Sequence, residues 1–285
     1  LATAGAFDCF PDVKRGQYFA LDKKGSSFIE NLVRYGNKVQ NEKRTSQKSL
    51  FEESAGFKFI QPEIPKAEDW PKLKRLIKEK ETIGIFLSAH PLDDYKFEIE
   101  HFCTATLSQF NDLESLKGKE LTIAGIVTGV KIGTTKTGRP YGFLTLQDFS
   151  DSYRFALFNT DYVEFSKFFT EGYHLLFKGK IQPKPFSNNE LEFKVKSINL
   201  LSDVKDEMIH TVSLKFPVNT ITSEFIKDFE EASGAGNGKV KLKLLVYDPD
   251  EKLSINFFSR SRKINLTGKF IRFLKDYPDI ELTVN

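Results

Sequence analysis

The change of hydrophobic period at Lys119 places the strongest limit on what this chain can fold into. From Lys119 to Leu200, apolar and polar residues alternate in short runs, a period of two that is typical of half-buried β-strands. A segment with helical spacing, residues 161–169, separates the third run from the fourth. The first run begins at Leu121, and the others span 141–147, 152–158, 173–181 and 191–200. Five strands with a helix in that position are the order of an OB-fold barrel.

Glycine and loop residues refine this expected barrel. Gly125 lies where the alternation of the first strand changes phase, and a glycine at a phase shift predicts a β-bulge. Residues 131–140 are rich in Gly, Thr and Lys, so we expect them to form the loop before the second strand.

Residues 205–285 predict a second, smaller unit of mixed type. Helical spacing covers 223–232 and 267–275, and strand-like runs cover 212–216, 240–247, 252–258, 264–266 and 280–284. We expect a small α+β domain.

The first third of the chain has helical periodicity that a polar stretch interrupts. Residues 26–35 predict a helix that Gly36 ends, and Pro71 opens a second helix that should run to Ala89-His90. Almost no apolar residue occurs from Asn37 to Lys48, so a flexible linker is expected there. The predicted fold is multidomain α+β, with a helical N-terminal segment, a five-stranded OB-fold barrel and a small C-terminal α+β domain. The expected segments are 1–36, 37–69, 70–117, 118–204 and 205–285.

The overall charge does not identify a nucleic-acid-binding protein. The chain has 42 Lys+Arg against 39 Asp+Glu, so any contact with DNA must come from local basic patches.

Cys9 and Cys103 are far apart, which favours two reduced thiols in a cytosolic protein over a zinc site. No apolar run reaches the length of a membrane span. The chain starts at Leu1 without a signal pattern, and we expect it to be part of a longer protein.

One face of the expected barrel has the chemistry that single-stranded DNA needs. Tyr141, Phe143 and Thr145 alternate with Gly142, Leu144 and Leu146, so the two aromatic rings should point away from the core. Aromatic rings stack on bases, and nearby cations neutralise phosphates. The other interpretation is that these rings only favour strand formation in a chain with 28 Phe. The residues expected to contact DNA are Lys131, Lys136, Arg139, Tyr141, Phe143, Arg154 and Lys184.

No residue pattern indicates catalysis. Asp93-Asp94 follows Pro91-Leu92, where capping of a helix start explains it better than a metal site. His90 is expected to bond the last carbonyls of a helix. No nucleophile elbow, Walker loop or dinucleotide fingerprint occurs in the sequence, so we assign no catalytic residue and no cofactor.

Three stretches carry more specific motifs. They read L-A-T-A-G-A-F-D-C-F at 1–10, E-T-I-G-I-F-L-S-A-H-P-L-D-D-Y at 81–95, and T-K-T-G-R-P-Y-G-F-L-T-L-Q-D at 135–148. Together they resemble the C-terminal portion of the alpha subunit of bacterial DNA polymerase III. The first is similar to the end of that family's helix-hairpin-helix region and the third to the opening of its OB domain. The second is similar to its H-P-L segment, with Phe86 where Tyr is common.

The resemblance implies an enzyme and several partners. The parent chain would be a cytoplasmic, magnesium-dependent DNA-directed DNA polymerase, a nucleotidyltransferase whose catalytic carboxylates lie upstream of this stretch. Gln47-Lys48-Ser49-Leu50-Phe51 resembles the pentapeptide that binds the sliding clamp (beta subunit), with Gln47, Ser49, Leu50 and Phe51 as contacts. By layout alone, residues 205–285 resemble the domain that binds the clamp-loader tau subunit.

Two other classes remain open from the sequence. A non-enzymatic single-stranded DNA-binding protein would have the same barrel with partner-interaction domains, but would not need residues 70–102. A nucleic-acid enzyme with an anticodon-type OB module, such as a tRNA synthetase, would need an ATP-binding motif, and none is visible.

Overall fold

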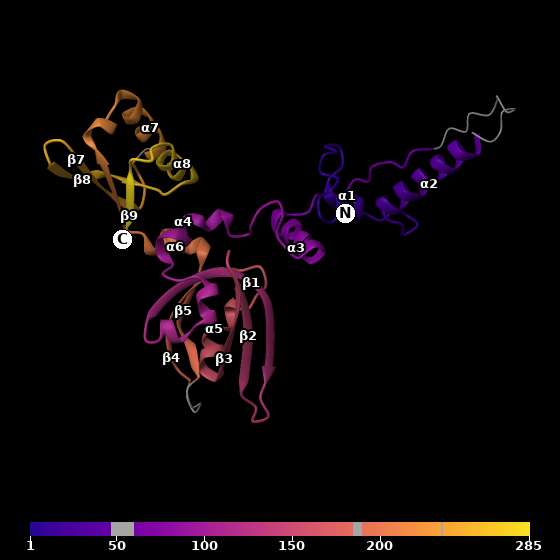
Figure 1. The fold of residues 1–285 in the computed structure, drawn as a ribbon, viewed down its shortest axis with the longest axis horizontal. Coiled ribbons are helices and arrows are strands. Elements are labelled where there is room, and N and C mark those ends of the chain that lie inside the picture. Colours follow the sequence, from indigo (N-terminus) through magenta and orange to yellow (C-terminus); the bar gives the residue numbers. More distant parts are fainter. Residues whose placement is uncertain (47–59, 185–189, 235) are drawn as a thin grey trace. The chain divides into compact units, whose positions relative to one another are not determined.

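The computed structural model describes residues 1–46, 60–184, 190–234 and 236–285, and it divides into two compact units (Figure 1). The first unit is Leu1–Pro91 and the second is Leu92–Asn285. The clamp-motif residues Gln47, Ser49, Leu50 and Phe51 lie outside the described residues. The predicted fold class is confirmed: helices come first, then a five-stranded antiparallel sheet, then a mixed α+β domain.

The helices of the first unit differ in length from those that the sequence predicted. They are α1 (Arg15–Tyr18), α2 (Phe28–Ser46) and α3 (Lys72–Ile83). The prediction that Gly36 ends its helix was wrong, because α2 continues for ten further residues, half of them good helix formers, and a mid-helix glycine costs only about 1 kcal/mol. The prediction that the next helix reaches His90 was also wrong. Gly84 ends α3 in the left-handed conformation, with φ at 92°.

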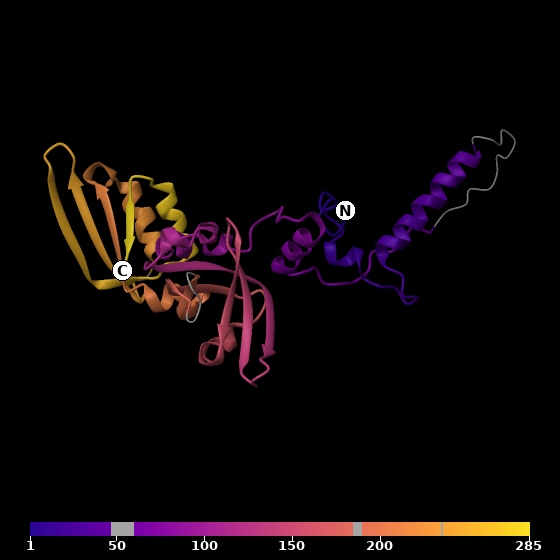
Figure 2. The same cartoon turned by 60° about the horizontal axis from the view of Figure 1, so that its bottom comes forward.

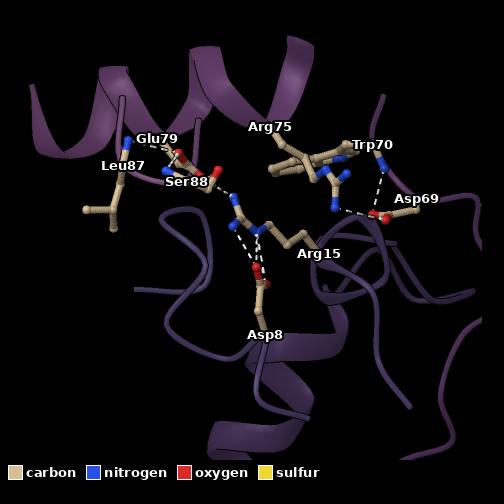
Figure 3. A network of polar contacts seen from close by, with 8 residues as sticks. All are labelled: Asp8, Arg15, Asp69, Trp70, Arg75, Glu79, Leu87 and Ser88. Atoms are coloured by element: carbon tan, nitrogen blue, oxygen red, sulfur yellow. Dashed lines mark hydrogen bonds and ion pairs between the residues drawn. The ribbon is translucent and has the colours of Figure 1, made fainter. Parts of the chain in front are cut away.

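A buried ionic network connects the turn before α1 to α3 (Figure 3). Arg15, 6% exposed, donates from its guanidinium to the Asp8 carboxylate and, over 2.6 Å, to Oε1 of Glu79. Glu79 is fully buried, and its Oε2 accepts the backbone N–H groups of Leu87 and Ser88 at 3.1 and 3.0 Å. Burial alone would raise the pKa of Glu79, but the bonds from Ser88 and Arg15 outweigh it and lower the pKa to about 2. Glu79 therefore holds the segment after α3 against the start of the chain.

The five-stranded sheet has the strand order β3-β2-β1-β4-β5, antiparallel throughout. Its members are β1 (Glu120–Thr134), β2 (Pro140–Gln147), β3 (Ser152–Phe158), β4 (His174–Pro183) and β5 (Leu191–Leu200). The helix α5 (Asn159–Phe165) and the 3₁₀ turn η4 (Ser166–Phe168) lie between β3 and β4 in the chain, where the sequence placed a helix. The short helices η1 (Asp93–Tyr95), α4 (Lys96–Phe102), η2 (Leu107–Asn111) and η3 (Glu114–Leu116) precede the sheet.

The first strand is longer than predicted, and its irregularity lies elsewhere. Residues 131–134 belong to β1, so the loop before β2 shrinks to residues 135–139. The register of β1 against β2 shifts between Val127 and Gly129, so the predicted bulge at Gly125 was wrong. A Cβ at Gly125 would lie 2.6 Å from the carbonyl oxygen of Gln147. Gly125 is therefore required for a close backbone approach and not for a bulge.

The barrel core is one apolar cluster to which every strand contributes. Leu144, Leu146, Leu175, Phe177 and Ile181 are fully buried within it. A Cβ at Gly142 would lie 2.5 Å from the Phe169 ring, so the absence of a side chain there allows the segment after α5 to pack on β2.

The C-terminal part of the second unit is a mixed four-stranded sheet with the order β8-β7-β6-β9. The elements after β5 are α6 (Leu201–Met208), β6 (Thr211–Pro217), η5 (Val218–Thr220), α7 (Ser223–Ser233), β7 (Val240–Asp248), β8 (Leu253–Ile264), α8 (Gly268–Asp276) and β9 (Glu281–Val284). Strands β6 and β7 are parallel, and the other pairs are antiparallel. Helices α7 and α8 lie on one side of the sheet (Figure 2).

The hydroxyls of Thr222 and Thr267 cap α7 and α8 by accepting the N–H groups of Phe225 and Phe270. The two separate strands predicted at 252–258 and 264–266 are instead the single strand β8. The extra residues of β8 opposite Leu242 form a bulge, which Ser259 closes with two hydrogen bonds to the backbone of Arg262.

Candidate nucleic-acid interface

The side of β1, β2 and β3 that faces away from the core presents nine positions in register. Antiparallel partners project from the same face of a sheet, so the pairings fix which side chains are neighbours. Lys131 lies opposite Phe143, Gly133 opposite Tyr141, and Arg154 opposite Thr145. The nine positions, here called the three-strand face, are Gly129, Lys131, Gly133, Tyr141, Phe143, Thr145, Arg154, Ala156 and Phe158.

The three aromatic rings of this face form one cluster. The ring centroids of Tyr141 and Phe143 are 5.5 Å apart, and Phe158 lies 6.0 Å from Tyr141 and 6.2 Å from Phe143. These separations are within the range of favourable edge and tilted ring contacts. Phe158 remains 46% exposed, so the cluster is open to a ligand at this end.

Small residues at three positions make the rings stand out from the face. Gly129, Gly133 and Ala156 carry little or no side chain. A Cβ at Gly133 would lie 2.6 Å from the hydroxyl of Tyr141, so the tyrosine lies directly over this glycine. None of the nine positions is acidic.

Two cations accompany the rings. The Arg154 guanidinium lies 3.9 Å from the centroid of the Phe143 ring, which is close cation–π contact. Lys131 is exposed on the neighbouring strand, opposite Phe143. The face therefore combines stacking surfaces with positive charge.

Lys136 and Arg139 lie in the closed turn between β1 and β2. The Thr135 N–H donates to the Arg139 carbonyl at 2.8 Å, and the Arg139 N–H donates to the Thr135 hydroxyl at 3.0 Å. Gly138 supplies the left-handed conformation of this turn, with φ at 77°. Both basic side chains are exposed just beyond the Tyr141 end of the three-strand face.

Lys184 does not lie on the three-strand face. It lines a groove of about 410 Å³ between the end of β3 and β5, together with Phe158 and Glu192. Its ammonium group lies 3.0 Å from the Glu190 carboxylate, and this bond raises the pKa of Lys184. Lys194 pairs with Asp161 in the same groove. Because its cations already have acidic partners, this groove is less suited to phosphate than the three-strand face.

Phe158 is the member of the cluster that the sequence analysis missed. The register of β3 against β2 places it opposite Tyr141. The alternation Arg154, Ala156, Phe158 was a signal in the sequence, since it continues the period of β3 away from the core.

Asp93, Asp94 and His90, which were considered for metal or acid–base chemistry, lie in η1 or just before it. Among the described residues, no group of three or more His, Cys, Asp and Glu side chains could hold a metal ion. Asp93 and Asp94 lie within η1, and no side chain caps its start, so the predicted capping role was wrong. His90 lies beyond the end of α3, and its ring contacts Phe86 edge-on, with the ring centroids 5.0 Å apart.

Cys9 and Cys103 are not joined by a disulfide; Cys9 is exposed and Cys103 is partly buried. Burial raises the pKa of Cys103 to about 12, so it is not a thiolate near neutral pH. Within the described part of the chain, no helix is long and apolar enough to cross a membrane.

Comparison with family models gives two matches. Residues 121–201 match an OB-fold nucleic acid binding domain, and residues 212–285 match the C-terminal domain of the DNA polymerase III alpha subunit. The first covers the five-stranded sheet and the second the four-stranded sheet.

Curated relatives extend the similarity to most of the chain. The DNA polymerase III subunit alpha of Borreliella burgdorferi is 28% identical over 259 residues, which are 86% of this chain and 22% of the relative. That of Pseudomonas fluorescens is 23% identical over 211 residues, 74% of this chain and 18% of the relative. That of Vibrio cholerae is 24% identical over 170 residues, 60% of this chain and 14% of the relative. The chain thus spans about a fifth of the length of these relatives or less.

Proposed function

The chain is homologous over most of its length to DNA polymerase III alpha subunits and contains their C-terminal domain, and from this premise we propose that it is the DNA-binding and partner-binding region of a replicative polymerase. In this proposal the OB-fold domain holds single-stranded template DNA. The polymerisation itself belongs to the whole parent protein, which would work in the cytoplasm and use magnesium.

The three-strand face is the observation that carries the proposal for DNA. Tyr141, Phe143 and Phe158 form one open aromatic cluster, and Arg154 and Lys131 provide charge beside it. Bases of any sequence can stack on such rings while the cations neutralise the adjacent phosphates. Lys136 and Arg139 would extend the phosphate path beyond Tyr141. Lys184, paired with Glu190, would contribute only by exchanging that partner for a phosphate.

Fluorescence anisotropy with a labelled oligodeoxythymidine tests this proposal. With about three phosphate contacts, the logarithm of the binding constant should fall with the logarithm of salt concentration with a slope near −2. Phe143→Ala/Arg154→Ala should weaken binding by about tenfold or more, because one stacking contact is worth roughly 1–3 kcal/mol.

A matched control exists in the same unit. Phe149 is 46% exposed, and the Lys96 ammonium lies 6.0 Å from its ring, but neither residue belongs to the three-strand face. Phe149→Ala/Lys96→Ala should leave DNA binding unchanged. Equal losses in the two double variants would mean that the three-strand face is not the binding surface.

We further propose that Gln47, Ser49, Leu50 and Phe51 bind the sliding clamp. The support is the pentapeptide itself and its place in the sequence between the resemblances at 1–10 and 81–95. Each apolar side chain would contribute roughly 1.5–3 kcal/mol if a pocket of the clamp buries it fully. Leu50→Ala/Phe51→Ala should therefore abolish most clamp binding in surface plasmon resonance. Phe57→Ala/Phe59→Ala, in the same stretch but outside the motif, should not, and unchanged binding of the first variant would exclude the motif.

Residues 205–285 are proposed to bind the clamp-loader tau subunit. The support is the match of residues 212–285 to the family's C-terminal domain and the similar layout. Deletion of 205–285 should abolish capture of the chain by immobilised tau. Retention of tau binding after this deletion would exclude the proposal.

Catalysis is proposed to reside outside this chain. A primer-extension assay with magnesium should therefore show no synthesis by the chain alone. Magnesium-dependent extension of the primer would contradict this assignment.

A further inference from the structure

The C-terminal sheet has one face that helices do not cover. Val212, Leu214 and Phe216 of β6 are buried, as are Val240, Leu242 and Val246 of β7. These alternate positions face α7 and α8, which lie on the same side of the sheet (Figure 2). The intervening positions project from the opposite side. None of the described residues on that opposite side is fully buried.

Lysines and aromatic rings alternate across this uncovered side. Its prominent residues are Lys215, Lys241, Lys243, Tyr247, Phe258 and Lys263, which together are called the open face. Register places Lys243 opposite Phe258 and Lys241 opposite Lys263. The open face therefore concentrates four positive charges and two rings on adjacent strands.

Each ring on the open face lies beside an ammonium group. The Lys243 ammonium is 5.4 Å from the centroid of the Phe258 ring, and the Lys215 ammonium is 5.4 Å from that of Tyr247. Phe258 is 63% exposed, which is unusual for a phenylalanine in a sheet and leaves its ring accessible. Such a ring with a cation beside it can stack on a base while the cation meets a phosphate.

Among the lysines of the open face, only Lys215 has an acidic partner in the described part of the chain. Glu281 on β9 pairs with Lys215 at 2.9 Å. Asp250 and Glu251 lie in the turn between β7 and β8, at the Tyr247 end of the strands. Within the described part of the chain, Lys241, Lys243 and Lys263 form no ion pair with an acidic side chain. The end of the open face at Phe258 therefore has an uncompensated positive charge.

We propose that the open face is a second binding surface for single-stranded DNA, distinct from the three-strand face of the OB-fold. The bases stack on Phe258 and, more weakly, on Tyr247, while Lys241, Lys243 and Lys263 neutralise phosphates. Charge complementarity argues for this occupant. The centre of a protein–protein interface is depleted of charged residues, whereas a lysine adjoins each ring here. The homologous chains are DNA polymerase subunits, so DNA is the nucleic acid expected at this surface.

The experiment uses the full chain with Phe143→Ala/Arg154→Ala as background, so that binding at the three-strand face of the OB-fold is weakened. The probe is a fluorescein-labelled oligodeoxythymidine of about 20 nucleotides, long enough for one such site. In this background, Phe258→Ala should weaken binding by about tenfold, the range expected for one lost stacking contact. Phe257→Ala is the matched control. Phe257 is the adjacent residue of the same strand and is 50% exposed, but it projects from the other side of the sheet.

Charge variants test the phosphate contacts separately. Lys241→Ala/Lys243→Ala should make the slope of the logarithm of the binding constant against the logarithm of salt concentration shallower by about 1.4. Each phosphate contact with a single strand contributes about 0.7 to this slope. Lys227→Ala/Lys275→Ala removes the same charge from the helices α7 and α8 and should leave the steepness unchanged. All these residues are exposed, and circular dichroism should show intact folding.

Three results would overturn the proposal. The first is equal affinity of Phe258→Ala and Phe257→Ala. The second is binding of a polyglutamate peptide as tight as that of the oligonucleotide and insensitive to Phe258→Ala, which would make the open face a dock for acidic peptides. The third is tighter binding of an oligouridylate than of the oligodeoxythymidine. Failure of the OB-fold proposal would give a different result: Phe143→Ala/Arg154→Ala, introduced alone into the chain, would not change its affinity for the same oligonucleotide.

Discussion

Replacement of Glu79 by alanine should destabilise the first unit, Leu1–Pro91, by about 3 kcal/mol. The carboxylate is fully buried and bonds the Arg15 guanidinium as well as two backbone N–H groups. Its removal leaves a buried cation with Asp8 as its remaining partner in the network and removes the acceptor of the Leu87 and Ser88 N–H groups. Breaking a buried pair in this way costs roughly 3–5 kcal/mol.

The pKa of Glu79 gives a second route to the same magnitude. It is about 2 in the folded chain against an ordinary value of 4.5. A difference of about 2.5 pH units corresponds to roughly 3 kcal/mol of preferential stabilisation of the ionised form in the folded state.

Trp70 provides a local assay for this unit. It is the single tryptophan of the chain, it lies in the first unit, and its ring stacks on Phe19 at 5.0 Å. Urea unfolding followed by tryptophan fluorescence therefore reports on Leu1–Pro91. Glu79→Ala should lower the urea concentration at the midpoint of this unfolding transition relative to the unchanged chain.

Glu81→Ala is the control for this prediction, because it lies on the same helix and forms only an exposed pair with Lys78. Such surface pairs contribute roughly 0–1 kcal/mol. If the two variants unfold at the same urea concentration, the network does not hold the unit together and the reasoning fails.

Three further predictions concern pH, packing and one tyrosine. The pKa of Glu79 in the folded chain lies below its ordinary value, so the ionised carboxylate contributes its full stabilisation of the first unit above about pH 4.5 and loses it as pH falls toward about 2. Urea midpoints that do not fall across this pH window would contradict the prediction. Gly142→Ala should lower the stability of the barrel by about 1–3 kcal/mol, because the added Cβ would lie 2.5 Å from Phe169, and an unchanged melting temperature would refute this. The hydrogen bond from Tyr277 to Asp228 raises the pKa of Tyr277 to about 12, so Asp228→Asn should shift the ionisation of one tyrosine to lower pH in an ultraviolet titration.

The sequence predicts the barrel well because its signals are local. Alternation identifies β2 and β3 almost to the residue, and the helical segment between the third and fourth strands identifies the topology. It also predicts that Tyr141 and Phe143 share a face, since this follows from the period of a strand alone.

The parts that the sequence does not predict depend on long-range contacts. The network of Arg15 and Glu79 joins residues that are 64 positions apart, and no local pattern indicates such a pair. Phe158 joins the aromatic cluster only through the register of β3 against β2. Lys184 looked like a free cation, but the chain returns Glu190 to within 3.0 Å of it.

Helix ends were mispredicted for a related reason. Gly36 is tolerated inside α2, while Gly84 ends α3, and the two glycines look alike in the sequence. What distinguishes them is the conformation that the surrounding fold requires. Gly84 has a φ of 92°, and the chain after it turns so that Leu87 and Ser88 can reach Glu79.

The central claim, that the three-strand face holds single-stranded DNA, is tested most directly by photochemical crosslinking. An oligodeoxythymidine containing 5-iododeoxyuridine forms adducts with aromatic side chains on which the modified base stacks. Irradiation of the complex, digestion and mass spectrometry should locate adducts on Tyr141, Phe143 or Phe158. Excess unlabelled oligonucleotide should suppress them. Adducts confined to residues outside the three-strand face, or none on these three rings, would contradict the account.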